Sequence, residues 1–216
     1  SDIFDAPPWL RPPRLSLNWD RIAAVTALSA VMRMEVLFDG VEAVQPGMLQ
    51  SLPAGSPAVP VWRPSAFVGA DAPAGQEAER ELVRRVEACT AALAEDHARI
   101  LVEVSGGLDS AIVARTLGEL GLAGRACGWL NYAGDRPEED ESAYARAVTD
   151  RLGAPLTVAR RGSGPLEEAD FAELAPALRP ALHAVDAPRD RDGAARALAL
   201  GAGAVLSGQG GDAVFF

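Results

Sequence analysis

The stretch that decides the fold is ILVEVSGGLDSAIVARTLGELG, residues 100–121. Its mainly apolar start, Ile100–Val104, predicts a buried strand, and Ser-Gly-Gly-Leu-Asp-Ser follows at residues 105–110. Apolar residues with the spacing of a helix packed on a sheet come next: Ala111, Ile112, Val113, Leu117 and Leu120. Glycines let backbone N–H groups approach an anion, and a helix N-terminus adds unpaired donors and partial positive charge. The stretch therefore predicts a phosphate-binding turn.

This turn is not a Walker loop. That loop ends in Gly-Lys-Ser/Thr and uses the Lys to contact the outer phosphates. The present chain contains no Lys, and all 20 of its basic residues are Arg. A lysine-free turn that includes an aspartate suits a nucleotide whose phosphates are held through Mg²⁺ and backbone N–H groups.

A second glycine turn lies near the end of the sequence. Gly203–Ser207 predicts another buried strand, and it leads into Gly208-Gln209-Gly210-Gly211-Asp212. Ligands of open α/β sheets bind at the carboxyl ends of the strands, so Asp212 is expected at the same edge as Asp109. Two carboxylates facing one triphosphate would form a typical Mg²⁺ site, in which the phosphates complete the coordination.

The first motif, SGGLDS, resembles the pyrophosphate-binding loop of the ATP pyrophosphatase (PP-loop) superfamily, whose members cleave ATP between the α- and β-phosphates. Together with LSGQGGD at residues 206–212, it is similar to the synthetase domain of the asparagine synthetase family. That family includes glutamine-dependent asparagine synthetases, β-lactam synthetases and lasso-peptide macrolactam cyclases. One position departs from it: many members have Glu after the second-motif Asp, and this chain has Ala213.

The resemblance implies that the domain binds ATP and Mg²⁺. It assigns the phosphates to Ser105, Gly106, Gly107 and Ser110, adenine and ribose to Val104, Leu130, Ser207 and Gly208, and Mg²⁺ to Asp109 and Asp212. In the family a mostly helical region follows the second motif and supplies the acceptor-side groups. These groups are expected beyond Phe216, so no catalytic residue is assigned.

Three activities remain open. The first is AMP-forming amide synthesis, in which aspartate is adenylated and a nitrogen donor attacks. The second is macrolactam formation on a peptide, which the Ala213 departure and the Phe215-Phe216 ending slightly favour. The third is a nucleotide-binding module without turnover, although a site without turnover has no physical need for both aspartates. The expected partners are a carboxylate substrate, a nitrogen donor, the remainder of the synthetase domain, and a glutaminase domain or a second copy of the chain.

The sequence divides into two parts. Residues 1–68 contain a Pro-rich arm, a helix and short strands, and they resemble the end of a glutaminase-like domain at Val44–Leu49 and Trp62-Arg63-Pro64. The glutaminase of the family uses an N-terminal Cys, whereas this chain starts with Ser1, which is expected to be a fragment end. No glutaminase activity is therefore expected. Residues 69–216 are expected to be a PP-loop synthetase domain truncated after the second motif.

The remaining pattern predicts an α/β fold of the PP-loop, or adenine nucleotide α-hydrolase-like, type: a parallel sheet with helices on both faces. Further strands are expected at Arg125–Tyr132 and Pro155–Ala159. Helices are expected at Arg21–Met32 with Asn18 or Asp20 as cap, at Gln76–His97, from Glu141 to Leu152, at Leu166–Leu182, and at Gly193–Leu200 with Asp192 as cap. The predicted inward faces are Leu82, Val86, Cys89 and Leu93 in one helix, and Ala143, Tyr144, Ala147, Val148 and Leu152 in another.

Composition excludes several classes of protein. The net charge of −10 disfavours a nucleic-acid surface, which requires a basic patch. No apolar run is long enough to span a membrane and no targeting signal opens the chain, so a soluble cytoplasmic protein is expected. Cys89 and Cys127 are predicted to be buried, reduced thiols. His97 and His183 are isolated and are predicted to be surface or cap residues.

Overall fold

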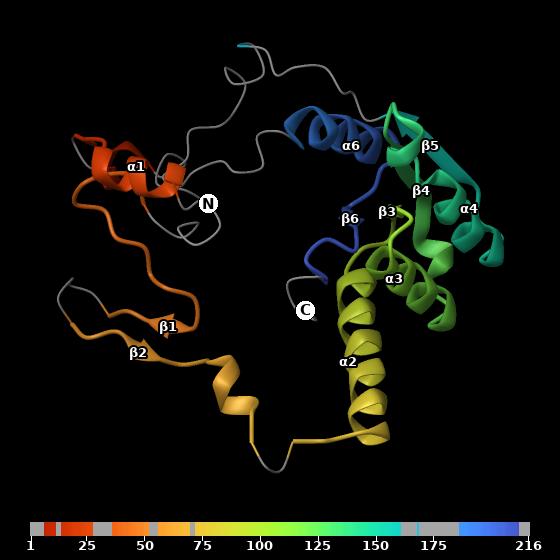
Figure 1. The fold of residues 1–216 in the computed structure, drawn as a ribbon, viewed down its shortest axis with the longest axis horizontal. Helices are drawn as coiled ribbons and strands as arrows, with labels where there is room; N and C mark the ends of the chain where they lie inside the picture. Colours follow the sequence, from red (N-terminus) through yellow and green to blue (C-terminus); the bar gives the residue numbers. More distant parts are fainter. Residues whose placement is uncertain are drawn as a thin grey trace. The chain divides into compact units, whose positions relative to one another are not determined.

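The computed structural model describes residues 7–11, 14–27, 36–51, 56–69, 72–160, 168 and 186–211. The chain divides into two compact units (Figure 1). Residues 1–72 and 166–187 form the first unit, and residues 73–165 and 188–216 form the second. No helix in the described part of the chain combines the length and apolar character that crossing a membrane requires.

Within the described residues, the second unit is built on a four-stranded parallel sheet of order β5-β4-β3-β6. The strands are β3 (Ile100–Glu103), β4 (Ala126–Ala133), β5 (Leu156–Arg160) and β6 (Ala204–Leu206). Ile100, Leu101 and Val102 of the central strand β3 are all buried, as expected for a parallel strand covered on both faces. All four strands lie where the sequence predicts them.

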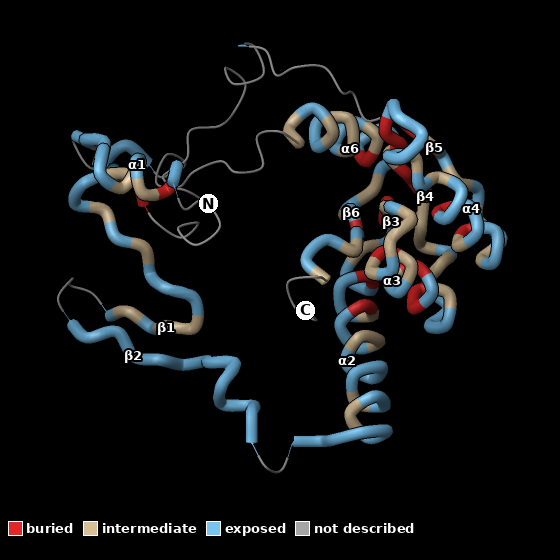
Figure 2. The backbone as a smooth tube through the Cα atoms, in the orientation of Figure 1, coloured by how far each residue is buried: buried red, intermediate tan, exposed pale blue. Residues whose placement is uncertain are grey.

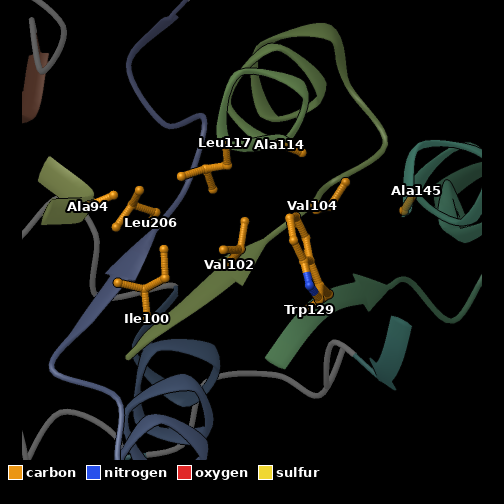
Figure 3. Close-up of a cluster of buried hydrophobic side chains, with 9 residues drawn as sticks. All are labelled: Ala94, Ile100, Val102, Val104, Ala114, Leu117, Trp129, Ala145 and Leu206. Atoms are coloured by element: carbon orange, nitrogen blue, oxygen red, sulfur yellow. The ribbon is translucent and has the colours of Figure 1, made fainter. Parts of the chain in front are cut away.

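Helices cover both faces of this sheet, which confirms the predicted fold class. They are α2 (Gln76–Glu95), α3 (Leu108–Glu119), α4 (Ser142–Arg151) and α6 (Ala187–Ala199). One core cluster joins Ile100, Val102, Val104, Trp129 and Leu206 to Ala94 of α2, Ala114 and Leu117 of α3, and Ala145 of α4 (Figure 3). The alternate residues Leu101, Leu130 and Ala159 pack with Ala197 of α6 on the other face.

The buried faces of α2 and α4 differ from the predicted ones by about one residue. In α2, Leu82 and Leu93 are 47% and 64% exposed, and Cys89 is exposed too, whereas Thr90 and Ala94 are buried. Figure 2 shows that most of α2 is exposed and that its buried part lies toward its C-terminal end. In α4, the prediction is wrong for the exposed residues Ala143, Tyr144 and Ala147, and the buried residues are Ala145 and Thr149. Small side chains face the core because they let each helix approach its neighbours closely. In α3, Leu117 is buried as predicted, but Ile112 and Leu120 are partly exposed.

The start of α6 also differs from the prediction. The helix begins at Ala187, with Pro188 in its first turn, a position that proline tolerates well. Asp192 therefore lies inside the helix and does not cap it. Its carboxylate instead accepts hydrogen bonds from Tyr132 of β4 and from Arg196 one turn later. A tertiary partner thus replaces the local capping role that the sequence suggests.

The first unit contains α1 (Trp19–Ala27) and a hairpin of β1 (Met48–Leu49) and β2 (Val59–Pro60). Asn18 caps α1, since its Oδ1 accepts a hydrogen bond from the Arg21 N–H at 2.8 Å. At Gly47, with φ of 74°, an added Cβ would lie 2.2 Å from the Trp62 carbonyl oxygen. The Pro46-Gly47 and Trp62 segments thus pack together. The end of the predicted Arg21–Met32 helix, His183 and nearly all of Leu166–Leu182 lie outside the described residues.

Replacing Leu117 with Ala tests the core between α3 and the sheet. Its side chain is 0% exposed, so we expect the free energy of unfolding to fall by about 2–5 kcal/mol in urea titrations. Leu198→Ala is the matched control, because Leu198 is 80% exposed and its loss is expected to change the stability by less than about 0.5 kcal/mol. Equal losses of stability in the two variants would contradict the packing described here.

Candidate functional site

A cavity of about 450 Å³ lies at the carboxyl ends of the neighbouring strands β3 and β6. It is lined by residues from both glycine motifs and from α6: Glu103, Ser105, Gly107, Leu108, Asp109, Ser110, Arg189, Ser207, Gly208, Gln209 and Gly210. Six residues that the sequence selects are therefore brought to one place: Ser105, Gly107, Asp109, Ser110, Ser207 and Gly208. This is the edge of a parallel sheet where ligands bind.

Serine hydroxyls hold the first motif in shape. Ser110 Oγ accepts a hydrogen bond from the Ser105 N–H at 3.1 Å and donates one to the Gly107 carbonyl at 3.1 Å. Because that bond uses the single Ser110 hydroxyl proton, Ser105 Oγ is the donor in the 3.0 Å contact between the two hydroxyls. Ser105 Oγ also accepts from the Gly107 N–H at 3.2 Å. Ser110, which is only 3% exposed, thus stabilises the turn through its hydrogen bonds.

The N-terminus of α3 opens at this cavity without a side-chain cap. Its N-cap residue is Gly107, which makes no side-chain capping bond. The N–H groups of a first helical turn have no intrahelical acceptors, and they carry a partial positive charge. Gly106, which precedes the N-cap residue of α3, has a φ of 102°. A Cβ added to Gly106 would lie 2.7 Å from both Cβ and O of Glu141. The turn is thereby pressed against the start of α4, and the helix end is suited to an anion.

The second motif closes directly on the first. A Cβ added to Gly208 would lie 2.3 Å from the Ser110 nitrogen and 2.7 Å from the Asp109 carbonyl carbon. One added to Gly211 would lie 2.2 Å from Asp109 Oδ2. A side chain at Gly208 would therefore collide with the backbone of α3, whereas one at Gly211 would displace the Asp109 carboxylate. The two turns form one site around Asp109.

Only one of the two predicted metal ligands, Asp109, lies within the described residues. Asp109 lines the cavity, while Asp212 lies outside the described residues. Within the ranges that the structure describes, no group of three or more His, Cys, Asp or Glu side chains could hold a metal ion. The assignment of Mg²⁺ to Asp109 and Asp212 stays a prediction.

Three other predicted residues lie around the cavity rather than on its lining. Val104 and Leu130 are 0% and 2% exposed, and the Val104 N–H donates to the Leu130 carbonyl at 2.8 Å. Gly106 is packed on Glu141, as described above. These residues fix the path of the chain from β3 into the first motif.

The α6 side of the cavity carries an ion pair that the sequence did not reveal. Arg189 of α6 pairs with Glu103, the last residue of β3, and the two side chains are 30% and 14% exposed. The guanidinium also lies over the Tyr132 ring, 5.3 Å from its centroid. The two residues are 86 positions apart in the sequence, so no local pattern predicts the pair. The one sequence signal is Glu103 itself, a charged residue at the end of an otherwise apolar strand.

Tyr132 connects this ion pair to the rest of α6. Its hydroxyl donates to Asp192 Oδ2 at 2.8 Å, and Arg196 Nε donates to the same oxygen at 2.6 Å. Burial and then the Asp192 carboxylate raise the pKa of Tyr132, which keeps the phenol protonated as a donor. The hydrogen bond from Arg196 is the main cause that lowers the pKa of Asp192. The network holds Tyr132 beneath the Arg189 guanidinium.

A parallel sheet with helices on both faces and two glycine turns at its carboxyl edge defines an α/β domain of the PP-loop type. The family model for asparagine synthase matches residues 81–216, which is more than half of the chain. The chain therefore belongs to the asparagine synthase family, a membership that supports ATP-dependent amide-bond synthesis as its general activity. A comparison with curated proteins found no match.

Proposed function

We propose that this chain carries the nucleotide site of an AMP-forming amide ligase. ATP would transfer its adenylyl group to a substrate carboxylate, and a nitrogen nucleophile would then displace AMP. The contact that carries the proposal is the one between Gly208 and the start of α3, because it joins the two glycine motifs around a single cavity. Two separate turns would not enclose a triphosphate.

The lining of the cavity fits this use. The uncapped N-terminus of α3 offers N–H donors to phosphate oxygens, and the absence of a side chain at Gly107 lets a ligand approach the backbone. The lining includes two carboxylates, Glu103 and Asp109, and Arg189 is its only cationic side chain among the described residues. Arg189 already pairs with Glu103, so a bound polyanion still requires another positive charge near Asp109.

Mg²⁺ would supply that charge. Carboxylate oxygens are ligands that Mg²⁺ prefers, and the ion usually combines one or two of them with substrate phosphates. Asp109 on the cavity wall fits this requirement, with Asp212 as the second proposed ligand. When bound, the ion would neutralise negative charge on the phosphates, while the backbone of both turns holds them in line.

Asp109→Asn is expected to weaken binding of Mg·ATP at least about tenfold, since the loss of a direct ligand exceeds that of an outer partner. Asn has nearly the same shape as Asp, so its contact with Gly211 is preserved. Isothermal titration measures the effect, and Asp150→Asn, which alters an exposed carboxylate of α4, is the control. Unchanged binding in both the Asp109→Asn and Asp212→Asn variants would rule out the metal assignment.

The acceptor is the point on which the candidate activities differ. Full-length protein with Mg·ATP is incubated with aspartate and ammonia, with aspartate and glutamine, or without an acceptor, and the nucleotides are quantified. AMP and pyrophosphate that appear only with aspartate would establish asparagine synthesis, and the two nitrogen sources would be compared directly. ADP in place of AMP would overturn the proposed chemistry.

Macrolactam formation on a peptide is the second candidate, and Ala213 favours it. Many members of the family have Glu at this position, so this chain either holds metal or substrate in another way or uses a different acceptor. If ATP binds but no AMP forms with aspartate, peptide substrates become the next acceptors to test. Binding without AMP for any acceptor would indicate a nucleotide-binding module.

A further inference from the structure

Asn131 is a fully buried polar residue of β4 next to the first glycine motif. Its side chain is 0% exposed, and Nδ2 donates to the Val104 carbonyl at 2.7 Å and to the Ser105 carbonyl at 3.1 Å. Only an amide nitrogen can face two carbonyl oxygens in this way, which fixes the orientation of the amide. One side chain therefore grips both peptide units at the point where β3 passes into the turn.

Within the described residues, the Asn131 amide is hydrogen-bonded at its nitrogen but not at its oxygen. Asn131 Oδ1 is buried without a hydrogen-bond partner among the residues that the structure describes. Buried acceptors are nearly always paired, and leaving one unpaired is unfavourable. A leucine would bury no such oxygen, but it would leave the Val104 and Ser105 carbonyls without this donor. The two hydrogen bonds that Nδ2 donates are consequently the feature of this side chain that needs an explanation.

The two bonds determine where the neighbouring N–H groups point. In a planar trans peptide, the C=O and N–H groups lie on opposite sides of the bond. The Val104 carbonyl faces Asn131, and the N–H of the same peptide unit, on Ser105, donates instead to Ser110 Oγ at 3.1 Å. By the same geometry, the Ser105 carbonyl bond turns the Gly106 N–H away from the buried amide.

We propose that Asn131 is a positioning residue for nucleotide binding. It fixes the Ser105–Gly106 peptide and with it the positions of Ser105 and Gly107, the residues of the first motif that line the cavity ahead of α3, for binding phosphate oxygens. This inference rests on the proposed function, since it needs the turn to bind phosphate. Asn131 itself does not line the cavity and touches no reacting group.

Asn131→Asp is the most direct test, because it keeps the shape and removes the amide nitrogen that donates to both carbonyls. An ionised carboxylate would place oxygens against two carbonyl oxygens, and a protonated one would have a single donor for the two, so in either form the Ser105–Gly106 peptide would lose its present orientation. Since the loss of a hydrogen bond to a charged group lowers affinity by about tenfold to a hundredfold, we expect Mg-pyrophosphate and Mg·ATP to bind about tenfold or more weakly per folded molecule. Asn131→Leu removes the same donors without charge and serves if the Asp variant does not fold.

Thr149→Val separates positioning from stability. Thr149 is also 0% exposed, and its Oγ1 bonds only within α4, to the Ala145 carbonyl at 3.2 Å. Circular dichroism gives the folded fraction, and titration of the full-length protein gives the affinities. We expect wild-type affinity in Thr149→Val, and for Asn131→Asp a raised KM for ATP with the acceptor KM unchanged. Wild-type affinity in both folded Asn131 variants, or equal weakening in Thr149→Val, would overturn the inference. Failure of the wild-type protein to bind either ligand would instead refute the proposed function.

Discussion

Replacing Gly208 with Ala is expected to lower ATP-dependent turnover about a hundredfold, since a displacement of about 1 Å at a reacting site has an effect of this size. The added methyl group would lie 2.3 Å from the nitrogen and 2.8 Å from the Cα of Ser110. Both atoms belong to the backbone of α3, so no flexible side chain can move aside. The second glycine turn must therefore shift away from the first, and the cavity between them opens. Steady-state kinetics with Mg·ATP measures the loss.

Gly124→Ala is the matched control for this steric effect. An added Cβ at Gly124 meets nothing within 4 Å. Gly208 is not among the glycines with positive φ, so backbone strain does not confuse the comparison. We expect the Gly124 variant to keep wild-type kinetics. Normal ATP affinity and turnover in folded Gly208→Ala protein would show that the two motifs do not act as one site.

Replacing Arg189 with Gln is expected to weaken ATP binding between about tenfold and a hundredfold. The substitution leaves the Glu103 carboxylate without its partner on the wall of a cavity that must accept a polyanion. Two unit charges about 6 Å apart at an effective dielectric constant of about 20 interact by about 3 kcal/mol, or roughly a hundredfold. Partial exposure of both side chains reduces the effect. Titration with Mg·ATP at low ionic strength measures it.

Removing both charges should restore much of the lost affinity. In the double variant Glu103→Gln/Arg189→Gln the Glu103 carboxylate is removed together with its partner, and such replacements are often nearly neutral. Arg115→Gln provides the control, because Arg115 pairs with Glu119 on the exposed surface of α3 and contributes little. If the double variant binds ATP as weakly as Arg189→Gln alone, then Arg189 acts on the nucleotide directly and not through Glu103.

The strands and glycine turns were predictable because their signals are local. A short apolar run that leads into a glycine turn predicts a parallel strand, as in Ile100–Glu103 and Ala204–Leu206. The predicted burial holds for Ile100, Leu101 and Val102 of β3, whereas Val205 of β6 is 47% exposed. The inward faces of the helices were less predictable. The helical periodicity of apolar residues selects large side chains such as Leu93 for the buried face of α2. In the structure, close packing buries the small neighbour Ala94 completely. An amphipathic pattern therefore identifies a helix better than it identifies the buried face.

The polar partners of the site depend on approaches that no local pattern contains. Arg189 reaches Glu103 across 86 residues, and Asn131 reaches the first motif from the neighbouring strand. Asp192 shows the opposite case: the local sequence predicts a helix cap, but its carboxylate accepts a hydrogen bond from Tyr132 of a distant strand instead. The sequence could thus identify the turns that surround the cavity but not the side chains that support them.

A structure of the full-length protein with Mg²⁺ and an ATP analogue that cannot be cleaved between the α- and β-phosphates tests the central claim most directly. We expect the phosphates in the cavity between the two glycine turns, next to Gly107 at the start of α3 and to Ser207 and Gly208 on the opposite side. Phosphates bound elsewhere, or in contact with only one of the two turns, would contradict the account.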